Sequence, residues 1–192
     1  MRCISCHRLS WKSICSTCST TILKPSISKR MVGSLEVYSF YHYQNISKYI
    51  ASKYTMHGYL IYRALANITT KPFMQEFSQS LSKPLYIIGI DEKIRYGYSH
   101  VAILTHVMQT PLSIPLHHKL VAQNQVNYAG KSLDYRLNNP RDFKYSGKGD
   151  IEAILVDDTI TTGITLQEAY ITLQQYNVKI LFALTLSDAK ER

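Results

Sequence analysis

The residues with the clearest chemistry lie in segment 154–166, Ile-Leu-Val-Asp-Asp-Thr-Ile-Thr-Thr-Gly-Ile-Thr-Leu. An apolar, β-branched run ends in two carboxylates, Asp157 and Asp158, and a loop rich in hydroxyls leads into a helical pattern. A helix that begins there offers free backbone N–H groups and the positive end of its dipole to a phosphate. The two acids would repel a second phosphate but accept hydrogen bonds from sugar hydroxyls. The segment therefore predicts a sugar-phosphate site, with ribose on the acids and the 5′-phosphate on the loop.

Other interpretations of this segment are weaker. A Walker loop requires GxxxxGK[ST], which the sequence lacks. The acidic pair of a response regulator would follow the first strand of its domain, whereas this pair lies near the end of the chain. One alternative remains: the two acids are ordinary surface residues, and a threonine beside them caps the helix. The loop residues that would serve a phosphate are Thr161, Thr162, Gly163 and Thr165.

The second group with chemical potential is a set of four cysteines, Cys3, Cys6, Cys15 and Cys18, in the pattern C-x2-C-x8-C-x2-C. Two such pairs form a tetrahedral four-sulfur site, which suits a structural Zn2+. So short a segment cannot bury a core, and a metal would supply its folding energy. Two disulfides or a rubredoxin-like iron site are the alternatives. Disulfides need an oxidising compartment.

Charge is distributed unevenly along the 192 residues, whose net charge is +9. Residues 1–75 contain ten Lys or Arg and one acid, while residues 76–192 contain equal numbers of basic and acidic residues and have a net charge of zero. Such asymmetry favours a polyanionic partner, or else serves solubility. Hydrophobic residues make up 45%, which excludes a fully disordered chain. Without a long apolar run or an apolar segment in residues 1–20, we expect no membrane insertion and no secretory signal peptide.

The pattern along the chain predicts three parts: a four-cysteine zinc finger at 1–22, a polar linker at 23–34, and an α/β domain at 35–192. Periodicity predicts the following elements. Strands are expected at 35–43, 85–90, 112–116, 152–157 and 178–186, helices within 46–70 and at 99–109 and 164–176, and polar loops at 122–150 and 158–163. The helix at 99–109 would begin at an N-capping Ser99. A strand, a helix and a strand at the end of the chain imply a right-handed βαβ unit and a parallel sheet.

The string VDDTITTGIT resembles the phosphoribosyl pyrophosphate (PRPP) signature of type I phosphoribosyltransferases, and the preceding cysteine module narrows the resemblance to the ComF/ComFC family of competence proteins. The resemblance covers nearly the whole chain. Arg95-Tyr-Gly-Tyr-Ser-His100 takes the place of the family's R-x-G-[FY]-N-Q element, with Ser99 and His100 in place of Asn-Gln. Arg136-Leu-Asn-Asn139 matches a later R-x-x-N element.

This resemblance implies a type I phosphoribosyltransferase fold, with a parallel sheet flanked by helices and a small hood, and Mg2+ carried mainly by the diphosphate. The loop after strand 85–90 would bind diphosphate through Lys93 and Arg95, and Asp91 or Glu92 would reach Mg2+ through water. Lys131 and Arg136 would close over PRPP. The expected PRPP-binding residues are Asp157, Asp158, Thr159, Thr161, Thr162, Gly163, Thr165, Lys93, Arg95, Lys131 and Arg136.

Two functions follow. The resemblance favours a cytoplasmic protein of natural transformation that handles incoming single-stranded DNA and binds Mg–PRPP, with a helicase or a recombination mediator as a candidate protein partner. The alternative is an active phosphoribosyltransferase of nucleotide metabolism, whose acceptor the sequence does not reveal. Basic residues are interleaved with tyrosines in residues 1–75. This combination suits single-stranded DNA, because basic side chains contact the phosphates and aromatic rings stack on the nucleobases. The expected DNA contacts are Arg2, Arg8, Lys12, Lys24, Lys29 and Arg30.

Overall fold

A computed structural model gives the fold of the chain and describes residues 1–91, 93–94, 96–124 and 132–190. The strands are β1 (Ser28–Val32), β2 (Leu35–His42), β3 (Leu85–Gly89), β4 (Ser113–Pro115), β5 (Leu120–Ala122), β6 (Phe143–Tyr145), β7 (Ile151–Ile160) and β8 (Val178–Asp188). The helices are α1 (Ser16–Thr21), α2 (Tyr43–Ile50), α3 (Gly58–Ile68), α4 (Thr70–Phe77), α5 (His100–His106), α6 (Leu133–Asn138) and α7 (Ile164–Gln174), with 3-10 turns η1 (Ala51–Tyr54) and η2 (Ser78–Ser80). No helix in the described ranges is long and apolar enough to cross a membrane.

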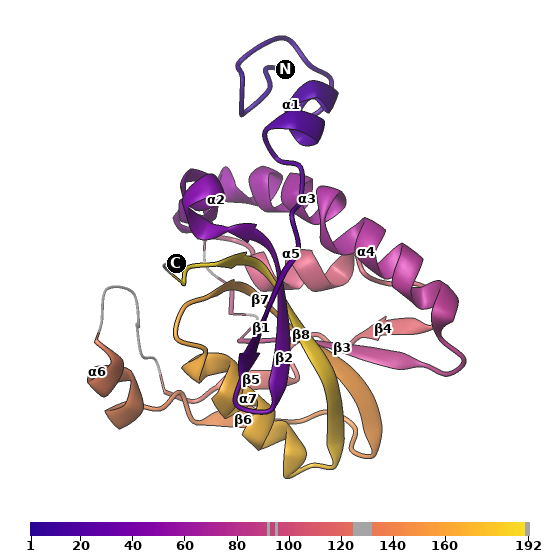
Figure 1. Cartoon of the computed structure of the whole chain (residues 1–192), viewed down its shortest axis with the longest axis vertical. Coiled ribbons are helices and arrows are strands. Elements are labelled where there is room, and N and C mark those ends of the chain that lie inside the picture. Colours follow the sequence, from indigo (N-terminus) through magenta and orange to yellow (C-terminus); the bar gives the residue numbers. More distant parts are fainter. Residues whose placement is uncertain (92, 95, 125–131, 191–192) are drawn as a thin grey trace.

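A six-stranded sheet in the order β1-β2-β8-β7-β3-β4 forms the centre of the molecule (Figure 1). Every neighbouring pair is parallel except β1–β2 at one edge. The central strands are near-continuous apolar runs because helices cover both faces of the sheet. The predicted α/β fold with a parallel sheet is confirmed, and the strand–helix–strand unit at the end of the chain is β7–α7–β8.

Two apolar layers lie on opposite faces of the sheet. Helices α2 to α5 cover one face, and α7 with the small β5–β6 sheet covers the other (Figure 1). Ile154 and Val156 of β7 belong to the first layer, while Ala153 and Leu155 belong to the second. Side chains alternate along a strand, so the two aspartates that follow are directed to different faces of the sheet.

Part of the segment predicted as a linker, Ser28–Val32 of 23–34, forms the edge strand β1. This strand pairs antiparallel with β2, and the two-residue turn between them has Gly33 at a φ of +59°. Its polar composition fits an edge strand, whose outer face meets water. The division of the chain into domains stays a prediction.

Two loop boundaries also differ from the sequence prediction. Strand β7 continues to Ile160, so Asp158 lies within the strand and not in a loop at 158–163. The polar stretch 122–150 contains α6 and β6, and the pairing of β6 with β5 gives backbone hydrogen bonds to a segment whose composition suggests a loop. Ser99 caps α5 as predicted, since its Oγ accepts a hydrogen bond from the N–H of Ala102 at 3.1 Å.

The N-terminal residues pack beside α2, at one end of the molecule (Figure 1). The hydroxyl of Tyr41 donates to the carbonyl of Leu23 at 2.7 Å, and that of Tyr49 donates to the Ser5 hydroxyl at 2.9 Å. Leu23 is fully buried. These contacts join residues 1–23 to the α/β layer through buried tyrosines.

Candidate functional site

Asp158 is the centre of a buried polar cluster at the carboxyl end of β7. Its Oδ2 lies 2.7 Å from Nζ of Lys53, 3.1 Å from the hydroxyl of Tyr62 and 3.5 Å from Nε2 of His100. These three partners come from η1, α3 and α5, the helical layer on that face of the sheet. Only 5% of Asp158 is exposed, so the ion pair with Lys53 is shielded from water.

The surroundings of Asp158 keep it ionised. Burial alone would raise its pKa, but the charges of Lys53 and His100 and the hydrogen bonds from Lys53 and Tyr62 outweigh burial and lower it. Burial and the Asp158 charge raise the pKa of Tyr62 well above its ordinary value, so the phenol stays a donor. Asp158 is therefore a fixed negative charge whose position is set by three elements.

Asp157 has the opposite character. It is half-buried, and its Oδ1 accepts the backbone N–H of Asp158 at 2.7 Å. Burial, and next the charge of Asp158, raise its pKa to about 8, against the smaller lowering influence of Lys53 and Arg141. The raised pKa favours the protonated form of this carboxyl, which can both donate to and accept from hydroxyls. A cation brought near it would favour its ionised form.

The loop after β7 has the geometry of an anion cradle. Gly163 has a φ of +89° and precedes the first residue of α7. A Cβ at Gly163 would lie 2.7 Å from Cγ1 of Val32, so the close approach of β1 also requires glycine here. Thr161 and Thr162 are exposed in front of the N-terminus of α7, which presents unpaired N–H groups.

Two guanidinium groups flank the same loop. Nη1 of Arg136 donates to the hydroxyl of Thr161 at 2.6 Å, and Nη2 of Arg30 donates to the Thr161 carbonyl. Arg30 also forms an ion pair with Asp188 at 3.2 Å. The loop therefore combines a helix N-terminus, hydroxyl donors and two cations, which together suit a phosphate.

The loop after β3 begins with a further carboxylate, Asp91, which pairs with Arg141. Its Oδ2 is 3.2 Å from Nη1 of Arg141, and its Oδ1 accepts the N–H of Ala122 at 3.3 Å. Asp91 itself has a φ of +46°, and Tyr96 and Gly97 also have positive φ, so the chain turns sharply before α5. Carboxylate oxygens such as those of Asp91 are the donors that Mg2+ accepts, directly or through water.

The predicted site residues do not all converge. Asp157, Asp158, Thr161, Gly163 and Arg136 are brought together, with Thr162 and Thr165 on the loop and the first turn of α7. The hydroxyl of Thr159 instead lies 3.0 Å from that of Ser187 on β8, in hydrogen-bonding distance. Lys93 lies in the loop after β3, and its backbone N–H bonds to the Asp91 carbonyl. Arg95, Lys131 and Glu92 fall outside the described residues.

The predicted DNA contacts also separate into two groups. Arg2, Arg8, Lys12 and Lys24 are exposed in or next to the N-terminal module. Lys29 pairs with Glu36, and Arg30 is largely buried against Thr161 and Asp188. Arg30 therefore belongs to the phosphate loop by position, because β1 runs beside β2 and not along a free linker.

Sequence reasoning missed Lys53, Tyr62 and Arg141 as members of the site. Lys53 is 105 residues from Asp158 in the chain, and no motif surrounds it. Tyr62 fits the apolar face of a helix, which conceals its polar end. His100 was visible only as a departure from a family pattern.

The four cysteine sulfurs form a separate cluster, all within 4.8 Å of one another. Sγ of Cys6 and Cys15 are 3.8 Å apart, and sulfurs bound at about 2.3 Å to one tetrahedral zinc would be about 3.8 Å apart. The backbone N–H groups of Cys15 and Cys18 donate to sulfurs, as they do around metal-bound thiolates. No disulfide is present among them. The cluster can hold one metal ion, and the disulfide alternative is not the arrangement found.

No protein-family model matches the chain, and no curated protein matches it. Among solved structures, it is similar to a hypoxanthine phosphoribosyltransferase from Staphylococcus aureus, at 20% identity and a TM-score of 0.39, with 62% of this chain and 60% of that chain covered. An adenine phosphoribosyltransferase gives 14% identity, a TM-score of 0.44 and coverage of 90% and 89%. An orotate phosphoribosyltransferase from Mycobacterium tuberculosis gives 13% identity and a TM-score of 0.37, with 90% of this chain and 82% of that chain covered. At such low TM-scores, a function for this chain must rest on the site itself.

Proposed function

We propose that the site at the ends of β3 and β7 binds PRPP with Mg2+, as in a phosphoribosyltransferase. The observation that carries the proposal is the pairing of an anion cradle at the N-terminus of α7 with two carboxylates on adjacent residues at the end of β7. The loop from Thr161 to Thr165 and Arg136 would hold the 5′-phosphate. Asp157, the more exposed of the two acids, would face the ribose hydroxyls, with the buried charge of Asp158 next to it. Mg2+, held mainly by diphosphate oxygens and by Asp91 directly or through water, would neutralise the leaving group.

The chain's own residues suit the charge changes of phosphoribosyl transfer. Departure of diphosphate leaves positive charge on the ribose, and a fixed carboxylate such as Asp158 stabilises such charge in a dry site. The raised pKa of Asp157 allows it to donate to, or accept from, a ribose hydroxyl. Lys53 and Tyr62 hold Asp158 in place and do not themselves need to touch the substrate.

Calorimetric titration with Mg–PRPP tests this proposal. Arg136→Ala and Asp157→Ala should each weaken binding about 10- to 100-fold, since a charged hydrogen bond contributes about 1.5–3 kcal/mol. Lys144→Ala, which removes an exposed charge from β6, is the control and should leave affinity unchanged. Equal affinity for all four proteins, each folded, would remove the assignment.

Whether transfer occurs is a separate question. In the enzyme alternative, diphosphate is released from PRPP in the presence of an acceptor, and a panel of purine and pyrimidine bases supplies the test. Release with one base would establish the transferase. Binding of Mg–PRPP without release across the panel would favour a ligand-sensing site in a protein with another function.

We propose that this other function is the handling of single-stranded DNA during natural transformation, through the N-terminal module. One observation favours this function. Trp11 is 98% exposed, and two exposed basic residues, Arg8 and Lys12, lie on either side of it in the sequence. An exposed aromatic ring can stack on a nucleobase, while the neighbouring basic side chains bind the phosphates. The metal that folds this module is proposed to be Zn2+, from the four-sulfur donor set.

Fluorescence titration with a labelled oligonucleotide tests the DNA proposal. Trp11→Ala should weaken binding by about 1–3 kcal/mol. Arg8→Ala with Lys12→Ala should also flatten the dependence on salt, whose log–log slope changes by about 0.7 for each phosphate that is no longer neutralised. Trp11→Phe is the conservative control and should retain most affinity. Unchanged affinity and salt slope in both variants would place DNA binding elsewhere or remove it.

A further inference from the structure

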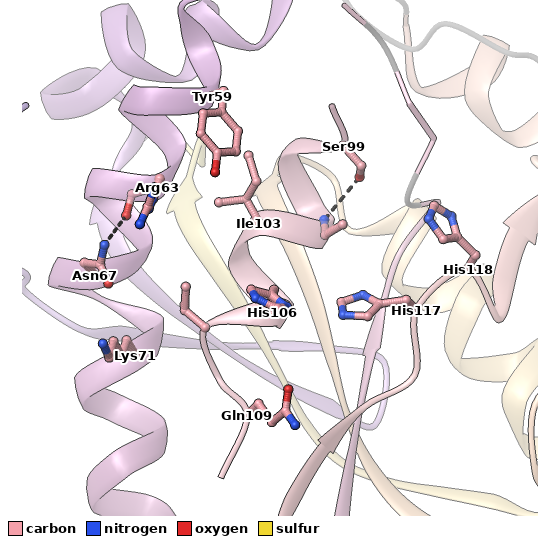
Figure 2. A pocket seen from close by; sticks show the side chains of 12 residues that line it. Tyr59, Arg63, Asn67, Lys71, Ser99, Ile103, His106, Gln109, His117 and His118 are labelled. Atoms are coloured by element: carbon pink, nitrogen blue, oxygen red, sulfur yellow. Dashed lines mark hydrogen bonds between the residues drawn. The ribbon is translucent and has the colours of Figure 1, made fainter. Parts of the chain in front are cut away.

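A cavity of about 690 Å³ lies between α3 and α5 (Figure 2), and no residue of the phosphate loop lines it. Tyr59, Arg63, Asn67 and Lys71 line one wall, in order along α3 and the start of α4. The opposite side comes from α5 and from the segment after β4. Its lining residues there are Ser99, Ala102, Ile103, His106, Val107, Gln109, His117 and His118.

The charge of this cavity has one sign. Among the described residues that line it, Arg63, Lys71 and three histidines are basic, and none is acidic. No ion pair is found for Arg63 or Lys71 within the described ranges of the chain. They lie eight residues apart on the wall formed by α3 and the start of α4, with Asn67 between them (Figure 2). Basic groups gathered in a concave site with no neighbouring acid attract an anion.

Ring and amide groups complete the lining. The Tyr59 hydroxyl is directed into the space in Figure 2, and the residue is 41% exposed. The rings of His106 and His117 lie 6.0 Å apart, centroid to centroid, at an interplanar angle of 34°. Asn67, whose Nδ2 donates one hydrogen to the Arg63 carbonyl at 2.9 Å, and Gln109 add amide groups. Flat rings and amides are the groups that contact a heterocyclic base, and the volume lies in the range of small-molecule sites.

We propose that this cavity binds a nucleotide. Its phosphate lies beside Asn67, between Arg63 and Lys71, and its base lies against Tyr59 and His106. The inference is independent of PRPP binding, because no residue of the cavity belongs to the phosphate loop. The two sites meet along α3 and α5, where Arg63 and Ser99 line the cavity and the adjacent residues Tyr62 and His100 contact Asp158.

Calorimetric titration of the full chain with AMP, in saturating Mg–PRPP, tests the proposal. Saturation with Mg–PRPP prevents AMP from entering the phosphate-loop site. The charge variant is Arg63→Ala with Lys71→Ala, and the matched control is Lys144→Ala with Lys148→Ala, two exposed bases on and beside β6. AMP should bind the wild type and the control alike, and the charge variant about 100-fold more weakly or not at all. Equal binding by all three proteins overturns the proposal, as does complete loss of AMP binding in the presence of PRPP.

Inorganic phosphate distinguishes a nucleotide from a free anion. Tyr59→Ala should weaken AMP about 10-fold and leave inorganic phosphate unaffected, while the charge variant should lose both. An unchanged AMP affinity in Tyr59→Ala overturns the nucleotide assignment. If Mg–PRPP fails to bind, the phosphoribosyltransferase-type site fails, but the difference between the charge variant and its control still reports on this cavity.

Discussion

The N-terminal module and the β7–α7–β8 unit each carry a short ligand-binding motif, but different forces hold the two motifs in place. In the module, the four cysteine sulfurs lie together, and the buried apolar residues that residues 1–23 themselves supply beside them are Ile14 and Leu23, at the edge of the layer formed by α2 to α5. In β7, Ala153 to Val156 are fully buried between the two apolar layers. A short motif with little core of its own depends on its ligand for folding, whereas a motif on a buried strand is positioned before its ligand arrives.

The largest expected effect would come from removing two ligands of the module. Cys15→Ser with Cys18→Ser should abolish metal binding and unfold residues 1–22, because structural zinc contributes about 10–16 kcal/mol in small zinc domains. Elemental analysis and hydrogen exchange measure the two effects. Thr17→Ala, on the exposed face of α1, is the control. The β7–β8 amides should keep their protection, and a simultaneous decrease in that protection would contradict the difference between the two regions.

The next effect concerns the buried ion pair of the α/β layer. Asp158→Ala leaves Lys53 without its carboxylate and should reduce the free energy of unfolding by about 3–5 kcal/mol. Replacing both, as Asp158→Ala with Lys53→Met, should cost less than the sum of the two single variants Asp158→Ala and Lys53→Met, since neither member of the pair is left without its partner. Urea unfolding of the two single variants and the double variant gives the coupling energy. Additive effects would show that the pair is not coupled.

A pH dependence should distinguish Asp157 from its neighbour. Its pKa is raised to about 8 in the folded chain, by burial first and by Asp158 next, with Lys53 and Arg141 opposing. The folded state therefore binds this proton more tightly than the unfolded state, and stability should fall between pH 4 and pH 8.

Asp157→Asn tests this dependence. The variant should match the wild type near pH 4 and exceed it by roughly 2–3 kcal/mol at pH 8, measured by urea unfolding. Asp150→Asn, an exposed acid at positive φ, should follow the wild type at both values. A wild type and Asp157→Asn that differ equally at pH 4 and pH 8 would contradict the raised pKa.

The smallest effect should follow from a single methyl group at the phosphate loop. Gly163→Ala places a side chain at a φ of +89° and should cost about 1–2 kcal/mol in thermal unfolding from backbone strain. Contact with Val32 adds to this cost. Adding Val32→Ala to Gly163→Ala should recover only the part of the lost stability that comes from this contact. Full recovery in the double variant would show that space, and not the backbone conformation, requires glycine.

Residues close in sequence determined much that could be predicted. The apolar run 152–157, the acids after it and the helical pattern beyond Gly163 specify β7, its loop and α7 within two or three residues, because each depends on local periodicity and on the conformational freedom of glycine. The cysteine spacing likewise brings four sulfurs together over sixteen residues. The roles of Arg95 and Lys131 stay predictions.

Tertiary structure decided the partners of these residues. Lys53 reaches Asp158 across 105 residues, and Arg30 reaches the phosphate loop across 131. Both contacts depend on which helix covers which face of the sheet and on β1 adding to its edge. The basic cavity between α3 and α5 arises in the same way, since its walls come from segments with no common motif. Local spacing cannot encode such contacts, because they form only when the apolar faces of distant elements pack together.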